Sequence, residues 1–250
     1  MAQSIVIGEQ TRFLSPFYLE LASQSLQRYK RSRKKPVTGY LEVFILVAAS
    51  LEAFINEVCL EKIERHKETG KSTRYLESVM SRNNRDRSIR DKWKLLSKCL
   101  WRGKKFDRRS RLWRDFNALI ELRNLLVHYK SEYKQPGYVP KVLKPVLARV
   151  LREKKQKPTG IGFLESLLGK HKHWTELICS AEMGYWALNT GLNMISHFLE
   201  FAPASDDIKD DYISMLSRFD WFRQHIDYRP YRAPIHTTTS TQSTFIEGTK

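Results

Sequence analysis

Residues 119–130, with the sequence LIELRNLLVHYK, set three polar side chains of different chemistry among leucines. Arg123 brings a guanidinium that stays charged. Asn124 brings an amide, and His128 brings an imidazole, a group that exchanges a proton near neutral pH. Such groups within two helical turns are able to bind an anion and to move a proton. This segment is therefore the first candidate for a functional site.

A helical wheel separates these polar groups from the apolar core. With Leu119 at 0°, the predicted core stripe lies between about 240° and 340° and consists of Leu122, Leu125, Leu126 and Tyr129. Glu121, Asn124 and His128 fall between about 140° and 200°, while Arg123 lies near 40°. The polar groups are therefore expected outside the core of their own bundle.

A second apolar strip, Ile120 and Val127, separates Arg123 from the other polar groups. We expect this strip to suit a helix–helix contact between two subunits. A plainer interpretation is also open. Arg123 could pair with a group on another helix beside Glu121, and His128 could occupy a helix C-terminus, where a cation is favourable.

The elements that must position this segment are helices. Caps, prolines and apolar spacing predict helices over residues 15–29, 38–67, 74–81, 89–100, 108–130, 145–155, 173–201 and 205–227. Ser15 is the candidate N-cap of the first helix, with Pro16 at its first position. No alternating strand pattern and no internal repeat occur in the sequence. The predicted fold class is an all-α multi-helix bundle.

The helix over 38–67 is apolar almost all round between Val43 and Leu51, which predicts a central helix covered on several sides. Asn56 and Glu57 fall with Glu42 within an arc of about 100°, and Glu52 lies just outside it. That arc forms either the solvent edge of the helix or one wall of a site.

Charge is the strongest signal in the composition. The net charge is +17, which points to a polyanionic partner because neutralising phosphates releases counterions. Residues 82–114 hold 14 Lys and Arg against three Asp, a net 11 of the 17 charges. We predict a nucleic-acid surface there, carried by Arg82, Arg85, Arg87, Arg90, Lys104, Lys105, Arg108, Arg109 and Arg111.

Four aromatic residues interleave with this basic segment: Trp93, Trp101, Phe106 and Trp113. Exposed rings could stack on unpaired bases. The alternative is that the rings pack in the core, as large aromatic side chains mostly do. Only the basic side chains would then face solvent.

Several classes of protein are disfavoured. The longest apolar run, residues 43–51, is shorter than the ~20 residues that span a bilayer, and no signal peptide is expected from residues 1–10. Three widely spaced cysteines predict neither a disulfide framework nor a zinc site. His171 and His173 lack acidic or cysteine partners at ligand spacing, so a loop or helix-start role is expected. We predict no metal, no cofactor, no membrane partner and a cytoplasmic location.

The segment LRNLLVH resembles the Arg-x4–6-His motif of HEPN domains (higher eukaryotes and prokaryotes nucleotide-binding). The segment AASLEAFINE, residues 48–57, is similar to the central helices of that superfamily. The resemblance covers residues 15–203 as a HEPN-like domain. It leaves an added C-terminal helix over 204–228 and a Thr/Ser-rich tail over 229–250, which we expect to be disordered.

The resemblance implies a metal-independent endoribonuclease that works from a homodimer, with the motifs of both chains facing each other. In this role His128 is the base or acid, Arg123 stabilises the charge on phosphorus, and Asn124 orients His128 or holds the phosphate. One histidine per chain does not easily serve as both base and acid, whereas a dimer supplies two. A supporting polar group on a neighbouring helix could be Glu52, Asn56 or Glu57.

Many proteins of this superfamily are toxins or anti-phage effectors, so the resemblance also implies that cellular role. RNA is then the expected substrate or regulator, and an acidic antitoxin protein or an antitoxin RNA is a further expected partner. One alternative is a HEPN-like RNA-binding or scaffold protein without catalysis. A third is a DNA-binding regulator that uses the basic helices.

Overall fold

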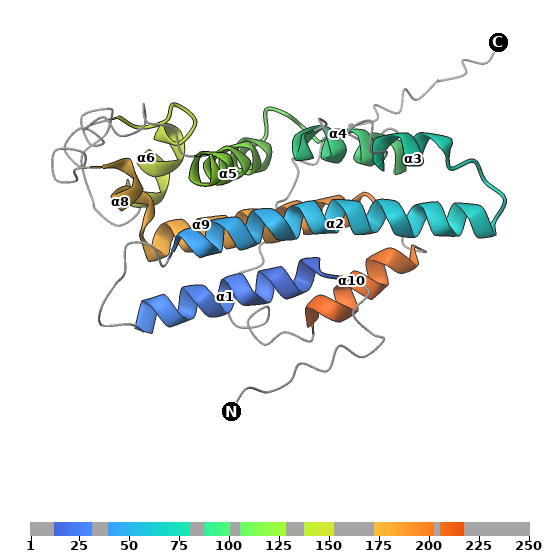
Figure 1. Cartoon of the computed structure of the whole chain (residues 1–250), viewed down its shortest axis with the longest axis horizontal. Helices are drawn as coiled ribbons and strands as arrows, with labels where there is room; N and C mark the ends of the chain where they lie inside the picture. The colour runs from blue at the N-terminus through green and yellow to red at the C-terminus, as the bar shows by residue number, and fades with distance from the viewer. Residues whose placement is uncertain are drawn as a thin grey trace, which may run out of the picture.

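The computed structural model of the chain describes residues 13–31, 40–80, 88–100, 106–128, 138–152, 173–202 and 206–217. Every regular element in these ranges is an α-helix, so the predicted all-α class is confirmed for them. The helices, labelled as in Figure 1, are α1 (Ser15–Arg31), α2 (Leu41–Glu68), α3 (Arg74–Met80), α4 (Ile89–Leu100), α5 (Arg111–Val127), α6 (Lys144–Arg152), α8 (Trp174–Ile178), α9 (Ala181–Glu200) and α10 (Asp207–Ser217).

The described helices form three layers (Figure 1). The long helices α2 and α9 lie side by side in the middle, and both contact α1 and α5. Helices α1 and α10 cover one face of this pair. Helices α3, α4, α5, α6 and α8 cover the other face. Helix α5, which carries the candidate motif, is therefore held against both central helices.

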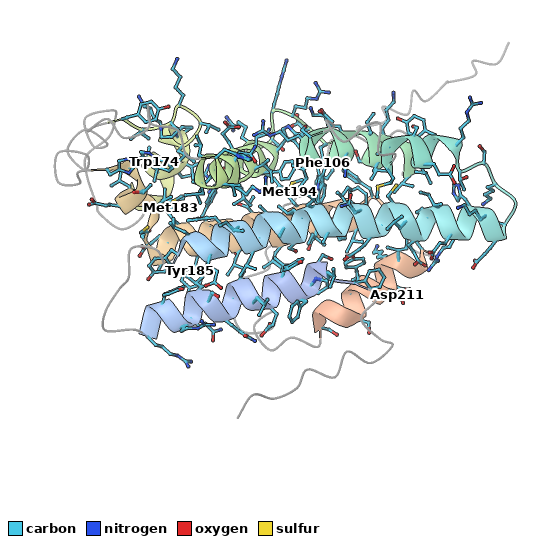
Figure 2. The ribbon with its side chains drawn as sticks, viewed as in Figure 1. Phe106, Trp174, Met183, Tyr185, Met194 and Asp211 are labelled. Atoms are coloured by element: carbon cyan, nitrogen blue, oxygen red, sulfur yellow. The ribbon has the colours of Figure 1, made fainter. Side chains whose placement is uncertain are left out.

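The prediction that α2 is a central helix is confirmed. Its buried side chains lie on several faces, and they include Phe44, Ser50, Cys59 and Ile63. Helix α2 is also long and apolar enough to cross a membrane, but more than half of its most apolar stretch is buried inside the protein, as in the core helix of a bundle. Side chains fill the space between the layers (Figure 2).

Trp93 joins four elements of the core. Its indole, which has no exposed surface, packs against Phe54 of α2, Phe116 of α5 and Phe198 of α9 at ring-centroid distances of 5.4–5.6 Å. Its Nε1–H donates to the Leu51 carbonyl at 3.3 Å, which satisfies the one polar atom of the ring. This cluster fixes α4 on the central pair and on α5.

The aromatic residues of the basic segment belong to this core. Phe106 and Trp113 expose only 6% and 3% of their surfaces, and Phe106 lies between the central pair and the layer above it (Figure 2). The interpretation of Trp93, Phe106 and Trp113 as rings that stack on bases is therefore wrong, because stacking needs an exposed face. Trp101 lies outside the described residues.

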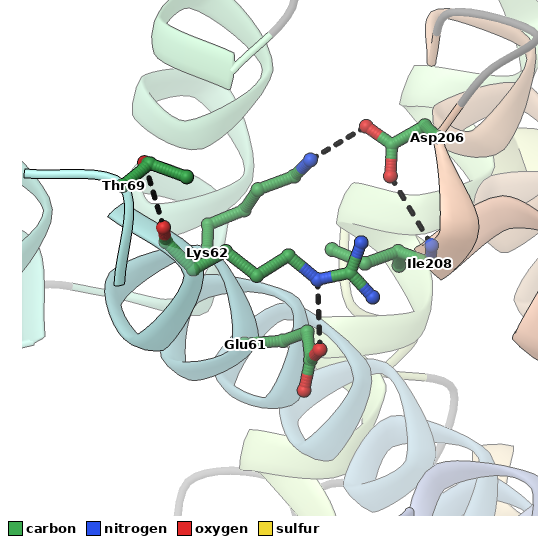
Figure 3. A network of polar contacts seen from close by, with 6 residues as sticks. Glu61, Lys62, Thr69, Asp206 and Ile208 are labelled. Carbon is green, nitrogen blue, oxygen red and sulfur yellow. Dashed lines mark hydrogen bonds and ion pairs between the residues drawn. The ribbon is translucent and has the colours of Figure 1, made fainter. Parts of the chain in front are cut away.

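Helix α10 is held on α2 by a partly buried ion pair. Lys62 Nζ donates to Asp206 Oδ2 at 2.5 Å, and Asp206 Oδ1 accepts the Ile208 N–H at 3.2 Å, which caps the helix (Figure 3). The predicted continuation of this helix to residue 227 and the tail over 229–250 lie outside the described residues. Ile208 and Tyr212 belong to the same hydrophobic core as α1 and α2.

One helix boundary was predicted wrongly. The expected single helix over 173–201 is interrupted between α8 and α9, where the Ser180 backbone is extended (φ −132°, ψ 154°). The Ser180 hydroxyl accepts the Met183 N–H at 3.3 Å and begins α9 as its N-cap. A serine side chain that bonds to the backbone in this way favours a helix start over a helix interior.

Two glycines of α9 give a matched test of the packing between layers. A Cβ added at Gly191 would lie 2.6 Å from Val47 Cγ1, and one added at Gly184 would lie 2.6 Å from Leu26 Cδ1. Valine is stiff at χ1, whereas the end of a leucine can rotate away. We expect Gly191→Ala to lower the free energy of unfolding by about 1–2 kcal/mol, because overpacking outweighs the gain in helix propensity.

The control is Gly184→Ala, which should change stability little or raise it. Chemical denaturation of both variants checks the expectation, and equal effects would contradict the packing of α9 on α2.

Candidate functional site at the end of helix α5

Helix α5 is defined by a serine cap at its start and by its core stripe. Ser110 accepts the Trp113 N–H at 3.1 Å, and the helix ends at Val127. Leu119 and Leu122 are fully buried. His128 is the C-cap, and its backbone N–H donates to the Asn124 carbonyl at 2.8 Å. The three candidate residues therefore share the last turns of one helix.

Arg123 and Asn124 are already joined. Arg123 Nη1 donates to Asn124 Oδ1 at 3.1 Å, and both side chains are partly buried. The bond holds the guanidinium beside the end of the helix and leaves its other N–H groups to bind an anion. The His128 side chain is exposed. Among the described residues, no hydrogen bond joins its ring to Arg123 or Asn124.

Only one of the two residues in the second apolar strip of α5 is exposed for contact with another subunit. Val127 is 49% exposed, but Ile120 exposes 5% of its surface and belongs to the core of its own chain. The expectation that both residues form a surface for another subunit is therefore wrong for Ile120. Because α5 packs against both α2 and α9, it buries more of its surface than the single leucine stripe, and Ile120 is part of that buried surface. Val127 alone remains exposed beside His128.

Glu121 is paired with α4. Its carboxylate accepts from Arg90 Nη2 at 2.9 Å, and Arg90 also donates to the Asn117 carbonyl at 3.1 Å. Arg90, predicted to bind nucleic acid, therefore helps to hold α4 on α5. No ion pair of Arg123 is found with a described residue, so the plainer interpretation of that arginine gains no support from this part of the chain.

The three residues of α2 that were candidates to support the motif, Glu52, Asn56 and Glu57, lie in different environments. Glu52 is exposed. Asn56 Oδ1 accepts from Lys92 Nζ at 3.0 Å and so ties α2 to α4. Glu57 faces the opposite layer, where its carboxylate meets α1 and α10. Within the described residues, the hydrogen bonds of Asn56 and Glu57 thus lead away from Arg123 and His128.

Glu57 caps helix α1. Its Oε1 accepts the Leu14 and Ser15 N–H groups at 2.6 and 3.3 Å, and its Oε2 accepts from the Ser15 hydroxyl at 2.7 Å and the Tyr212 hydroxyl at 2.6 Å. Ser15 is therefore not the N-cap that the sequence predicted, because its hydroxyl bonds to Glu57 and Tyr212 instead. Burial and the Glu57 carboxylate raise the pKa of Tyr212 well above its ordinary value.

The predicted nucleic-acid surface is described only in part. Arg108, Arg109 and Arg111 are exposed near the start of α5. Arg111 lies 3.8 Å from Asp115, whose carboxylate mainly accepts from Arg149 of α6 at 2.6 Å. The remaining predicted residues lie outside the described ranges: Arg82, Arg85, Arg87, Lys104 and Lys105.

Sequence reasoning missed a groove beside α4. Its volume is about 850 Å³, and its described lining consists of Asp91, Lys94, Leu95, Lys98, Phe106, Asp107 and Arg108. The four residues of α4 follow the i, i+3, i+4, i+7 spacing of one helical face, which the sequence does show. Nothing in the sequence indicates that the segment at Phe106 lies against that face.

His173 has the helix-start role that the sequence predicted. Its Nδ1 accepts the Thr175 N–H at 3.2 Å and caps α8. Within the described ranges, no three His, Cys, Asp or Glu side chains are grouped so that they could hold a metal ion. His171 lies outside those ranges.

A scan against protein-family models, a search of curated proteins and a search of solved structures found no match.

Glu57 and Glu52 provide a test of where α2 contributes to stability. We expect Glu57→Gln to lower the free energy of unfolding by about 1–3 kcal/mol, because an amide cannot replace a carboxylate that accepts four hydrogen bonds. Glu52→Gln, on the exposed face of the same helix, should change it by less than about 0.5 kcal/mol. Urea denaturation measures both, and a larger loss for Glu52→Gln would contradict the capping role of Glu57.

Proposed function

We propose that the protein is a metal-independent endoribonuclease of HEPN type, and that Arg123, Asn124 and His128 act on the scissile phosphate. The observation that carries the proposal is the Arg123–Asn124 hydrogen bond of 3.1 Å at the end of α5, next to an exposed His128. The motif thus lies at an accessible helix end of an all-α bundle, with its cation and its imidazole within one turn and a half of each other.

The proposed reaction uses the RNA's own 2′-hydroxyl. Its oxygen forms a bond to phosphorus while the bond from phosphorus to the 5′-oxygen breaks, which leaves a 2′,3′-cyclic phosphate and a 5′-hydroxyl. A base removes the 2′-proton and an acid protonates the 5′-oxygen. His128 supplies one of these functions. The Arg123 guanidinium faces the phosphate oxygens, where negative charge develops in the transition state.

A second histidine is needed for the other proton transfer, so the proposal includes a homodimer. His128 of the partner chain would serve as the second group. Val127, half exposed at the same helix end, offers an apolar contact there. Asn124 holds Arg123 by the bond already present, and its amide N–H groups can bind the phosphate or the imidazole.

The cellular role is proposed on the resemblance alone. It is that of a cytoplasmic toxin or anti-phage effector, restrained by an acidic antitoxin protein or an antitoxin RNA. The net charge of +17 favours an anionic partner of either kind, since oppositely charged surfaces associate faster.

A second candidate function is RNA binding or scaffolding without catalysis. The observation that favours it is that the described part of one chain joins Arg123 to Asn124 but leaves the His128 ring without a bond to either. A separate DNA-binding role would appear as a preference for duplex DNA in competition with single-stranded RNA.

Cleavage of labelled single-stranded RNA in EDTA tests the proposal. Wild type should cleave. We expect His128→Ala to lose about 10²–10⁴-fold in rate, as when a general acid or base is removed. Arg123→Ala should lose about 10²–10³-fold, as when a donor to the developing charge is removed.

Arg74→Ala and His66→Ala are matched controls, because they remove the same two residue types elsewhere. Arg74 is on α3, and His66 is near the C-terminal end of α2. Both should cleave at the wild-type rate, and all four variants should keep the wild-type circular dichroism spectrum. Tight RNA binding without cleavage by any protein would favour the scaffold function. Equal cleavage by all proteins would remove Arg123 and His128 from the site.

A further inference from the structure

The groove beside α4 is lined by charged and apolar side chains, and its described lining does not include the motif residues of α5. Asp91, Lys94, Leu95 and Lys98 form one face of α4, and Phe106, Asp107 and Arg108 complete the described lining. The other faces of α4 are occupied: Lys92 bonds to Asn56, Arg90 pairs with Glu121, and Trp93 is buried. The groove face is thus the side of α4 left open to a ligand.

The two acidic residues of the groove's described lining, Asp91 and Asp107, already form hydrogen bonds. Asp91 accepts from the Ser88 hydroxyl at 2.8 Å and from Lys94 Nζ at 3.0 Å, and these bonds lower the pKa of its carboxyl group. Asp107 Oδ1 accepts the Arg109 N–H at 2.8 Å. Lys94 also lies 6.0 Å above the Trp113 ring. These contacts fix Lys94 and both carboxylates in place.

Lys98 and Arg108 differ from Lys94. Both side chains are exposed, and neither forms an ion pair with a described residue. Two cations that face one concave surface are suited to successive phosphates of a single strand. The cationic surface continues from Arg108 onto Arg109 and Arg114, which are exposed at the start of α5.

The apolar residues of the described lining, Leu95 and Phe106, bear on how a strand would be recognised. Leu95 is partly buried, and Phe106 exposes only 6% of its surface, so no open aromatic face is offered by the described lining. Recognition would therefore act through phosphates rather than through base stacking, and it would be independent of sequence. A volume of about 850 Å³ lies within the range of ligand sites.

We infer that the groove beside α4 binds the phosphate backbone of an unpaired nucleic-acid strand through Lys98 and Arg108. That the strand is RNA rests on the proposed function. That the groove is the binding site rests only on its lining and its exposed cations. From Arg111 to Arg123, helix α5 rises about 18 Å, so the groove would hold the strand at a distance from the motif.

The test is RNA binding by Lys98→Ala/Arg108→Ala, measured by fluorescence anisotropy in a His128→Ala background. That background removes cleavage from the experiment, so the result stands whether or not the protein is a nuclease. The control is Lys71→Ala/Arg74→Ala, which removes the same two charges from exposed positions, one between α2 and α3 and one on α3. Labelled poly(U) and poly(A) oligonucleotides serve as probes over a range of NaCl concentrations.

We expect the groove variant to bind about tenfold more weakly at 0.15 M salt, and the slope of log K against log[salt] to fall by about 1.4, since each phosphate contact on a single strand contributes about 0.7. Both oligonucleotides should be affected alike, and the control should keep the parent slope. An unchanged slope for the groove variant, an equal loss for the control, or tighter binding of duplex RNA than of either strand would overturn the inference.

Discussion

The contact on which the rest of the molecule depends is the packing of Trp93 against the rings of α2, α5 and α9. It puts the largest side chain of α4 at the point where the central pair meets the outer layer. The indole is fully buried, and its N–H donates to the Leu51 carbonyl. Its apolar surface is therefore removed from water without leaving a buried polar atom unbonded. Helices α4 and α5 then have fixed positions.

Two surface features follow from this anchor. With Trp93 turned inward, the face of α4 that carries Lys94 and Lys98 is turned toward the groove. With α5 held by its leucines, the end that carries Arg123 and His128 is left accessible. The basic segment can therefore hold a net 11 of the 17 positive charges and still contribute to the core, since Trp93, Phe106 and Trp113 are buried while Arg108, Arg109 and Arg111 remain at the surface.

Local features of the fold were predictable from the sequence, and long-range pairs were not. Within the described residues, apolar periodicity and turn signals located the helices to within about three residues, apart from the break at Ser180. Glu57 caps α1 from 42 residues away, and Ile120 is buried by helices that the wheel of α5 does not include. The motif residues of the site were visible because they are neighbours in sequence. The groove was not, since the segment at Phe106 meets α4 only through tertiary packing.

The most direct test of the proposed chemistry is the identity of the RNA ends after cleavage, read by mass spectrometry. Attack by the 2′-hydroxyl, with His128 moving the proton, predicts 2′,3′-cyclic phosphate and 5′-hydroxyl ends from wild type, and release of these fragments about 10²–10⁴-fold more slowly from His128→Ala. Fragments that end in a 3′-hydroxyl would show that water or another nucleophile attacks. The same cyclic ends from His128→Ala at the wild-type rate would show that the reaction is performed elsewhere.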